Sequence, residues 1–431
     1  MMDAAAPPHV ARLAIADPLS IPELARRLRH THFVWDEYVG GKRRVDLSPL
    51  VLSRSAHEDA RDAALDVCAA IAETARLAFA TDEEASRYAF SPELLALARA
   101  SHRAGDDARL VRVDLLLGED DRFRACEINA DCPGGLNEAQ GLPDLLKRAG
   151  YTGRVDVTHV VDVLASRLVA LSGGKGSPRG TIAIVFATAY AEDLQLCALV
   201  ERAIVAAGGR AVRAPPTALS VEDGHCVAFG RRVSVLYRFY PSEHFVELPV
   251  AAALVPLVEA GTLATMSSFS CMFEQSKLAF ARAHALLPSL SDRSARAVAE
   301  RIPETVLPEA ANLLEDREGW VLKRALGRVG DEVFVGLLEP EAEWTRLVDG
   351  VRRASLLGEP WIAQRFVRQR TIATPWGPRF VTLGVYVCDG EFCGYFARLT
   401  EVSHTSHDAL VVPVVVAGAR EAFRGPLEVV S

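Results

Sequence analysis

The stretch Leu110-Val-Arg-Val-Asp-Leu-Leu-Leu117, Gly118-Glu-Asp-Asp-Arg122 and Phe123-Arg-Ala-Cys-Glu-Ile128 indicates how the core of this chain is built. Its two ends are apolar and its middle is a charged turn that contains a glycine, which is the pattern of two strands joined as a β-hairpin. Pro133-Gly134-Gly135 ends the pattern, and residues 137–149 then favour a helix. The sequence therefore predicts a hairpin that carries charges where a plain core strand would be apolar.

Four polar side chains of this hairpin are spaced so that they share a face. Arg112 and Asp114 are two residues apart, as are Glu127 and Asn129, and residues two apart in a strand point to the same side of the sheet. Two carboxylates and an amide oxygen suit Mg²⁺, which commonly binds through one or two carboxylates together with nucleotide phosphates. The spacing alone leaves open that this face is simply the solvated side of an edge hairpin.

Two lysines and a glycine-containing turn form a second group of candidates. Lys323 ends a predicted strand, Trp320–Arg324, and Gly327-Arg-Val-Gly330 separates it from a second strand, Glu332–Gly336, while Lys277 lies further upstream. A glycine turn after a strand lets backbone N–H groups approach phosphates closely. The alternative is an ordinary hairpin with a surface lysine.

The third candidate segment is Glu359-Pro-Trp-Ile-Ala-Gln364-Arg-Phe-Val367. A strand that leads into a mixed polar and apolar hinge can offer backbone hydrogen bonds to an adenine ring, although most such strands belong to the core.

A separate small lobe is predicted after the glycine-rich stretch 172–180. Residues 181–187 favour a buried strand, residues 191–207 a helix and residues 210–213 a second strand, an order that indicates a parallel sheet. Upstream, residues 44–52 are predicted to be a loop and residues 57–80 a helix. Downstream, strands are expected at 380–388, 392–400 and 410–416.

Composition limits the functions that are plausible. The chain has 431 residues, a formal charge of −8, 50% hydrophobic residues and 24% charged residues, values typical of a globular protein. The acidic excess argues against non-specific nucleic-acid binding. No apolar stretch reaches the roughly 20 residues of a membrane-spanning helix, and no secretory signal is evident. The eight cysteines form no C-x-x-C pair, so reduced thiols in a cytoplasmic protein are expected.

The order of the three groups resembles one known family. Cys126-Glu-Ile-Asn-Ala-Asp-Cys-Pro133, followed by Glu138-Ala139, is similar to the E-x-N-x-D-x-P and E-A signature of the glutathionylspermidine synthase-like ligases. Tyr237-Arg-Phe-Tyr-Pro-Ser-Glu243 resembles the R-x-Y-P-x-E stretch of that family. Gln275-Ser-Lys277, Leu322-Lys323 with the glycine turn, and residues 361–367 resemble its nucleotide-binding elements in order. The matched motifs run from about Phe33 to Pro413.

The resemblance implies an α/β (α+β) protein with an ATP-grasp fold in permuted motif order, plus the small parallel-sheet lobe. Residues 1–172 would form an N-terminal region with the metal-binding hairpin, residues 181–270 the small lobe, and residues 271–431 the ATP-binding part of the core. It also implies an ATP-dependent carboxylate–amine ligase that forms an amide through an acyl phosphate. Its substrates would be a small-molecule carboxylate and a small-molecule amine, its cofactors ATP and Mg²⁺, and neither nucleic acid nor membrane would be a partner.

The resemblance carries over residue by residue. Asp114, Glu127 and Asn129 would bind Mg²⁺. Arg112 would steady the acyl phosphate and the tetrahedral intermediate, and Arg398 is a candidate contact for the phosphate or the intermediate. Asp131 and Glu243 are candidate substrate contacts. The expected ATP contacts are Lys277, Lys323, Gly327, Arg328, Gly330, Gln364, Phe366 and Val367.

Three departures concern the substrates. The family commonly has Thr where this chain has Gly134-Gly135, the 326–330 loop differs in sequence, and residues 399–407 carry two histidines. A non-catalytic nucleotide-binding protein of the same fold and an ATP-grasp phosphotransferase are the alternative functions. Neither substrate nor the oligomeric state follows from the sequence.

Overall fold

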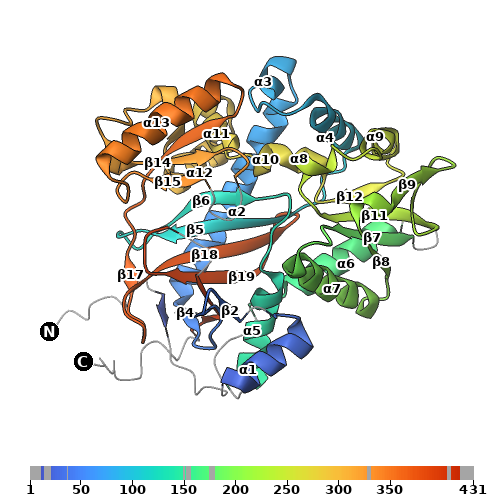
Figure 1. Ribbon diagram of the computed structural model, residues 1–431, viewed down its shortest axis with the longest axis horizontal. Coiled ribbons are helices and arrows are strands. Elements are labelled where there is room, and N and C mark those ends of the chain that lie inside the picture. Colours follow the sequence, from blue (N-terminus) through green and yellow to red (C-terminus); the bar gives the residue numbers. More distant parts are fainter. Residues whose placement is uncertain are drawn as a thin grey trace.

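The structure is a computed structural model that describes residues 11–13, 21–35, 37–148, 151, 157–173, 180–327, 332–404 and 409–417. Figure 1 shows three sheet-containing parts around one long helix. The predicted Arg328 and Gly330, and most of the glycine-rich stretch after Ser172, lie outside the described residues.

An antiparallel sheet forms the centre, with strand order β20-β19-β18-β5-β6 and the short β17 beside β18. The predicted hairpin is confirmed as β5 (Leu110–Leu117) and β6 (Phe123–Asn129). Its partners come from the other end of the chain: β17 (Thr371–Ile372), β18 (Arg379–Cys388), β19 (Glu391–Thr400) and β20 (Leu410–Val412). The sheet is therefore assembled from segments that are far apart in the sequence.

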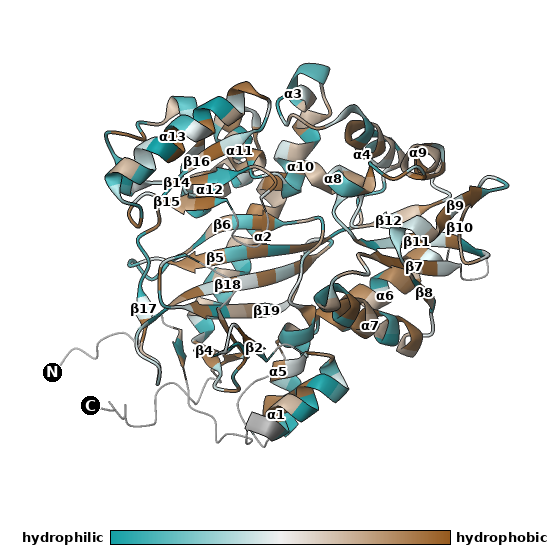
Figure 2. Cartoon of the chain, in the orientation of Figure 1, coloured by the Kyte–Doolittle hydropathy of each residue, from teal (hydrophilic) through white to brown (hydrophobic). Residues whose placement is uncertain are grey.

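Helix α2 (Arg54–Ala78) crosses one face of this sheet (Figure 1). Its side-chain cap is Ser53, whose Oγ accepts a hydrogen bond from the Ala56 N–H. The buried side of α2 is rich in alanine, and these small side chains pack against Val113, Leu115 and Val385 in one core cluster. The opposite face carries the polar Arg112 and Asp114 beside apolar side chains such as Phe396, and Figure 2 shows paler segments among the brown of these strands.

A second antiparallel sheet lies above the hairpin, with order β13-β16-β14-β15. Its strands are β13 (Thr305–Val306), β14 (Trp320–Arg324), β15 (Val333–Val335) and β16 (Trp361–Arg365). Helix α13 (Glu341–Leu356) buries Trp344, Val348 and Val351 against it, and α11 (Leu278–Ala285) and α12 (Asp292–Arg301) complete this part. The sheet carries the predicted Lys323 and Gln364.

The small α/β lobe is present, with order β8-β7-β11-β10-β9 and β12 beside β11. As predicted, β7 (Thr181–Phe186), α7 (Ala191–Ala206) and β8 (Arg210–Ala214) form a parallel strand–helix–strand unit. The other strands are β9 (Leu219–Glu222), β10 (His225–Ala228), β11 (Arg231–Phe239) and β12 (Ala264–Met266). Helices α6 (Val160–Ser172) and α7 share a core cluster with one face of the sheet, and α4 (Pro92–Ala104) and α9 (Ala251–Glu259) with the other.

The prediction of a loop at residues 44–52 was wrong for the last three residues. Residues 50–52 are strand β4, which pairs in parallel with β21 (Val414–Val416) and antiparallel with β1 (Arg12–Leu13). Leu50, Val51 and Leu52 are buried, because strands from both ends of the described chain cover them. The remaining elements are α1 (Ile21–Arg27), β2 (Tyr38–Val39), β3 (Lys42–Arg43), α3 (Asp82–Ser86), α5 (Leu136–Arg148), α8 (Ser242–Phe245) and α10 (Met272–Gln275).

Candidate active site

The four polar residues of the hairpin do share a face. In the pairing of β5 with β6, Arg112 lies opposite Asn129 and Asp114 opposite Glu127. Asp114 is 2% exposed and Arg112 8%, so the alternative of a solvated hairpin face is wrong for these two residues. The register shifts immediately beyond Asp114, where Leu115 pairs with Ala125. Cys126 is therefore the extra residue of a β-bulge.

A glycine in the next strand makes room for the buried charges. Gly384 of β18 lies directly opposite Asp114 of β5. A Cβ atom at Gly384 would lie 2.9 Å from Arg112 Cδ and 3.1 Å from Asp114 Oδ1, which is too close for an ordinary contact. The missing side chain therefore allows the Arg112–Asp114 pair to lie flat against the sheet.

Asp114 is held by two arginines and an amide. Arg112 binds it through two N–H groups, with Nε 2.7 Å from Oδ1 and Nη2 2.9 Å from Oδ2. Arg398 Nη2 is 2.7 Å and Asn129 Nδ2 3.2 Å from Oδ2. Burial alone would raise the pKa of Asp114, but Arg112 and Arg398 outweigh it and lower this pKa to about 2. The carboxylate is thus ionised at neutral pH.

Arg112 also contacts the chain after the hairpin. Its Nη1 donates to the Gly134 carbonyl at 2.8 Å, and the Tyr386 hydroxyl donates to the same carbonyl at 2.7 Å. The Phe396 ring centroid lies 5.4 Å from the Arg112 guanidinium and 5.5 Å from that of Arg398, within the range of a cation–π contact. These contacts orient both guanidinium groups toward the same side of the sheet.

Lys323 connects the upper sheet to the bulge. Its Nζ donates to the Cys126 carbonyl at 2.8 Å and to Gln364 Oε1 at 2.7 Å. Because Lys323 is only 7% exposed, the alternative of a surface lysine is wrong. Burial lowers the pKa of Lys323, and the nearby acidic groups partly offset this effect.

Lys277 lies beside the hairpin and approaches it from the N-terminal end of α11. Its Nζ is 3.0 Å from Glu127 Oε1 and donates to the Gly327 carbonyl at 2.6 Å. The side chain of Lys277 is 4% exposed and that of Glu127 23%. The pair therefore lies at the margin between the core and the open site.

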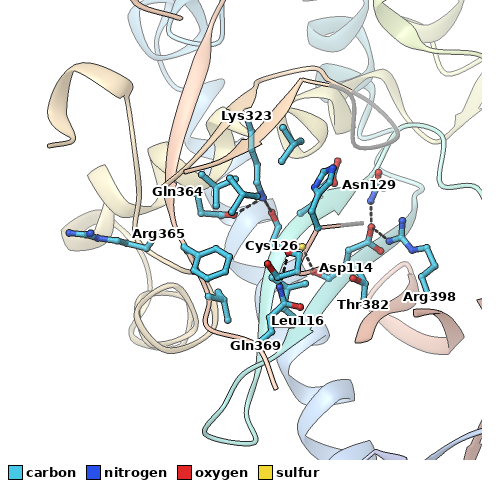
Figure 3. A pocket seen from close by; sticks show the side chains of 18 of the residues that line it. Asp114, Leu116, Cys126, Asn129, Lys323, Gln364, Arg365, Gln369, Thr382 and Arg398 are labelled. Carbon is cyan, nitrogen blue, oxygen red and sulfur yellow. Dashed lines mark hydrogen bonds and ion pairs between the residues drawn. The ribbon is translucent and has the colours of Figure 1, made fainter. Parts of the chain in front are cut away.

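One pocket brings most of the predicted residues together between the two sheets (Figure 3). Two groups of contacts are visible in the figure: Lys323 with Gln364 and Cys126, and Asp114 with Asn129 and Arg398. The predicted residues that line the pocket are Arg112, Asp114, Glu127, Asn129, Lys323, Gln364, Phe366, Val367 and Arg398.

Two of the predicted adenine contacts are already engaged. Gln364 Oε1 accepts from Lys323, and its Nε2 donates to Thr305 Oγ1 at 3.1 Å. The Phe366 N–H donates to the Gly319 carbonyl at 2.9 Å. The Gln364 amide and the Phe366 N–H are thus both used within the protein.

The structure places Asp131 and Glu243 away from this pocket. Asp131 has a fully buried side chain and is bound by Arg238 Nη1 at 2.5 Å and by the Ser242 hydroxyl at 2.8 Å. Its carboxylate thus joins the hairpin to β11 and α8, which corrects the expectation that it contacts substrate. Glu243 follows in α8, half-buried, and does not line the pocket.

Two polar residues of the pocket, Thr382 and Gln369, were not singled out by the sequence analysis, and a third, His404, was noted there only as part of the 399–407 segment. Thr382 lies opposite both Arg398 and Leu116 in the sheet, Gln369 Nε2 donates to the Ser403 carbonyl at 3.0 Å, and His404 lines the pocket on the same side. Burial and the charge of Lys323 lower the pKa of His404. The alternation of Thr382 and Gly384 is visible in the sequence, but the pairing of this strand with the hairpin is not.

The donor set fits a divalent cation. Asp114 and Glu127 lie opposite each other, and Asn129 is the next residue on the same face, so two carboxylates and an amide share one face of neighbouring strands. Oxygen donors of this kind are the ligands that Mg²⁺ prefers.

Comparison with known proteins bears on this arrangement. The sequence matches the family described as "Glutathionylspermidine synthase preATP-grasp" over residues 20–417. The chain belongs to this family. A search of curated proteins finds no matching sequence.

Among solved structures, a glutathione synthetase-like effector from Globodera pallida aligns with 88% of this chain and 92% of its own, with a TM-score of 0.59 and 11% identity. A chain assigned as a gamma-glutamylcysteine synthetase from Methylobacillus flagellatus aligns with 74% of this chain and 83% of its own, with a TM-score of 0.43 and 12% identity. The first likeness supports the ATP-grasp-related fold. Family membership supports an ATP-dependent ligase in general terms.

No helix among the described residues has the length and apolar composition needed to cross a membrane.

Proposed function

We propose that this member of the glutathionylspermidine synthase preATP-grasp family is an ATP-dependent carboxylate–amine ligase. In the first step a substrate carboxylate oxygen attacks the γ-phosphorus of ATP; an O–P bond forms, the bond to ADP breaks, and an acyl phosphate results. In the second step an amine nitrogen attacks the acyl carbon; a C–N bond forms, phosphate leaves with the electron pair of the C–O bond, and the nitrogen loses a proton to solvent.

The charged side chains of the site suit the charge changes of these steps. Phosphoryl transfer depends on positioning and on offsetting charge on the phosphate oxygens. Lys323 and Lys277 would supply that charge from the upper sheet and α11, and Arg112 and Arg398 from the central sheet. Because guanidinium groups donate in a fixed fork, the two arginines suit the oxyanion that develops at the acyl carbon.

Asp114, Glu127 and Asn129 would hold Mg²⁺, which when bound offsets the phosphate charge. The protein would hold the side-chain oxygens of these residues in place. The register of the hairpin keeps Asp114 and Glu127 together, and Arg112 and Arg398 keep Asp114 ionised. Thr382 and Phe396 lie beside the arginines on the same face and limit their movement.

The observation that carries the proposal is the convergence of the acidic hairpin, the lysine-bearing upper sheet and Arg398 on one pocket. Arg112, Lys277 and Lys323 are buried beside the carboxylates of Asp114 and Glu127. A solvated surface would not need this arrangement, since each buried charge costs free energy unless it is paired.

The test is ADP and phosphate release in a screen of amines and carboxylates. Release that requires both substrates, with an amide product detected by mass spectrometry, supports a ligase. A stable phosphorylated product formed without an amine would instead indicate a phosphotransferase, and nucleotide binding without turnover on any pair would indicate a non-catalytic protein.

Two variants connect the test to the site. Glu127→Gln and Lys323→Ala are expected to lower turnover by roughly 10²-fold or more, the usual cost of losing one charge-stabilising group. Lys147→Ala, an exposed position in α5, is the matched control and should keep wild-type turnover. Full activity in Glu127→Gln would overturn the assignment.

A further inference from the structure

In this structure the acidic and basic residues of the site are already paired with each other. Lys277 pairs with Glu127, and Arg112 and Arg398 pair with Asp114. Each carboxylate expected to bind a cation is thus held by a cation that is itself expected to bind phosphate or an acyl intermediate. These pairs must exchange partners when ligands arrive.

The Glu127–Lys277 pair is the more readily exchanged of the two. Glu127 is bound by Lys277 Nζ at 3.0 Å and its side chain is 23% exposed. Asp114 has a 3% exposed side chain and is held by four N–H groups from Arg112, Arg398 and Asn129. Opening the Glu127 pair therefore requires the loss of fewer contacts and less movement of buried atoms.

We infer that the Glu127–Lys277 ion pair is a switch that couples nucleotide binding to divalent-cation binding. The inference rests on the proposed function, because it assumes that Lys277 meets a phosphate. In the free protein, Lys277 competes with a cation for Glu127, and Glu127 competes with phosphate for Lys277. Whichever ligand binds first must break the pair, and the second ligand finds its group already released.

Lys277 is well placed for this exchange. Its Nζ also donates to the Gly327 carbonyl at 2.6 Å, a contact that does not involve Glu127. Such linkage is reciprocal: nucleotide raises the affinity for the cation by the same factor as the cation raises the affinity for nucleotide.

Lys323, which lines the pocket together with Glu127, provides a matched control. Lys323 is also buried beside Glu127, but its Nζ donates to the Cys126 carbonyl and to Gln364 Oε1, both uncharged acceptors. Lys277→Met and Lys323→Met each remove one positive charge near Glu127, yet only the first breaks an ion pair. The general loss of repulsion between the lysine charge and Mn²⁺ would raise Mn²⁺ affinity alike in both variants, whereas the switch predicts a difference.

The experiment measures equilibrium binding of Mn²⁺ to the full chain by electron paramagnetic resonance, with and without saturating ADP. Lys277→Met is expected to bind Mn²⁺ without ADP at least about fivefold more tightly than wild type, the lower end of ordinary coupling. The factor by which ADP tightens Mn²⁺ binding should shrink in the same variant. Lys323→Met should change Mn²⁺ affinity without ADP by less than half as much on a logarithmic scale.

Equal increases in Lys277→Met and Lys323→Met would overturn the switch, as would Mn²⁺ affinity within twofold of wild type in Lys277→Met. Lys277→Arg, which can keep the pair, should retain the wild-type coupling factor. If Lys277→Met does not fold, Glu127→Gln tests the other member of the ion pair. This variant should bind ADP more tightly than wild type in the presence of EDTA. Weaker or unchanged ADP binding contradicts the proposal.

The outcomes separate this inference from the proposed function. If the protein binds ADP and Mn²⁺ with the expected coupling but joins no carboxylate to an amine, the switch is supported and the ligase function is refuted. If the protein joins its substrates but Lys277→Met and Lys323→Met change Mn²⁺ affinity equally, the ligase function is supported and the switch is refuted.

Discussion

The space available in the candidate site limits which amino acids fit at a position as much as charge does. Gly384 is the clearest case, because a Cβ atom there would lie 2.9 Å from Arg112 Cδ and 3.1 Å from Asp114 Oδ1. The side chains that would have to move are themselves fixed by ion pairs and by the Gly134 carbonyl. A methyl group at this position cannot be absorbed by a flexible neighbour.

We therefore expect Gly384→Ala to displace the Arg112–Asp114 pair and to lower turnover at least about tenfold, with a loss of about 1–3 kcal/mol in the free energy of unfolding, the usual cost of overpacking. Turnover and urea unfolding measure the two effects. Gly350→Ala is the control: it lies in helix α13 with no atom within 4 Å of an added Cβ, and it should raise stability slightly. Normal turnover in Gly384→Ala would contradict the steric argument.

Asp106 gives the protein a pH dependence away from the site. Burial raises the pKa of its carboxyl to about 6, although Thr265 and Ser101 donate hydrogen bonds to it. The folded chain therefore holds this proton at pH values where the unfolded chain, with a pKa near 3.8, has lost it. The contribution of Asp106 to stability is present below about pH 4 and is lost as pH rises through about 6.

Asp106→Asn should remove this loss. The difference in the free energy of unfolding, variant minus wild type, is expected to increase from pH 4.5 to pH 7.5. The increase is at most about 3 kcal/mol for a pKa shift of this size. Urea midpoints at the two pH values provide the measurement. A difference between variant and wild type that does not change with pH would show that Asp106 does not titrate as stated.

At the level of single residues, the sequence predicted which side chains share a face better than it predicted their distant partners. Arg112, Asp114, Glu127 and Asn129 could be assigned to one face because strand periodicity is local. The burial of Asp131 could not be predicted, since its partners Arg238 and Ser242 come from a different lobe. Its place in the E-x-N-x-D motif gave no sign that it is structural.

At the scale of elements, α10 joins the hairpin to the segment that carries Lys277. Gln275 Oε1 accepts hydrogen bonds from the backbone N–H groups of Ala130 and Asp131, at 2.8 and 3.0 Å. These residues directly follow β6, which presents Glu127 and Asn129, and Lys277 comes two residues after Gln275. One amide side chain therefore sets the distance between the acidic hairpin and the lysine.

Gln275→Ala should leave two buried N–H groups without a partner, at a cost of about 1–3 kcal/mol each, and should reduce turnover. Gln275→Glu keeps an acceptor oxygen and is expected to recover part of both losses. Unfolding midpoints and turnover for the two variants provide the comparison. If alanine and glutamate behave alike, the hydrogen bonds do not set the geometry.

Strands with a sustained alternation of apolar residues were predicted well. Short strands whose formation depends on pairing with distant segments were predicted poorly. The hairpin, β14, β18 and β19 matched within a residue or two. Residues 410–416 form two strands rather than one, because Pro413 separates β20 from β21 and proline has no N–H to give to a ladder. Strand β4 was missed because its three residues depend on β1 and β21 for pairing.

On the scale of the whole molecule, two sheets from different parts of the chain meet at the pocket through polar contacts. Lys323 reaches the Cys126 carbonyl, and Lys277 reaches Glu127. A ligand bound between the sheets would add contacts to both at once, so binding should be visible in the stability of the entire chain.

ADP with Mg²⁺ at 100 times its dissociation constant should add about 2.7 kcal/mol to the free energy of unfolding, and for a chain of this size the melting temperature should rise by a few degrees. Differential scanning fluorimetry measures the shift. Lys323→Ala should lose most of it, while Lys147→Ala should keep it. A full shift in Lys323→Ala would indicate that the nucleotide binds elsewhere.

The overall architecture could be anticipated only by resemblance. Motif order indicated that the hairpin and the lysines belong to one site, but local patterns cannot state that Leu115 pairs with Leu383. Such long-range pairing depends on the total burial achieved by the finished fold, which no short stretch of sequence contains.

The distant pairing of β5 with β18 has a consequence for biosynthesis. The ribosome releases the hairpin long before the strand that completes its open edge, and at about 5–20 residues per second the interval is on the order of tens of seconds. During that time Val111, Val113 and Leu115 lack the neighbour that later covers them. Nascent chains stalled before Arg379 should therefore be strong chaperone clients and prone to aggregate, whereas the small lobe, whose strands end at Met266, has already emerged.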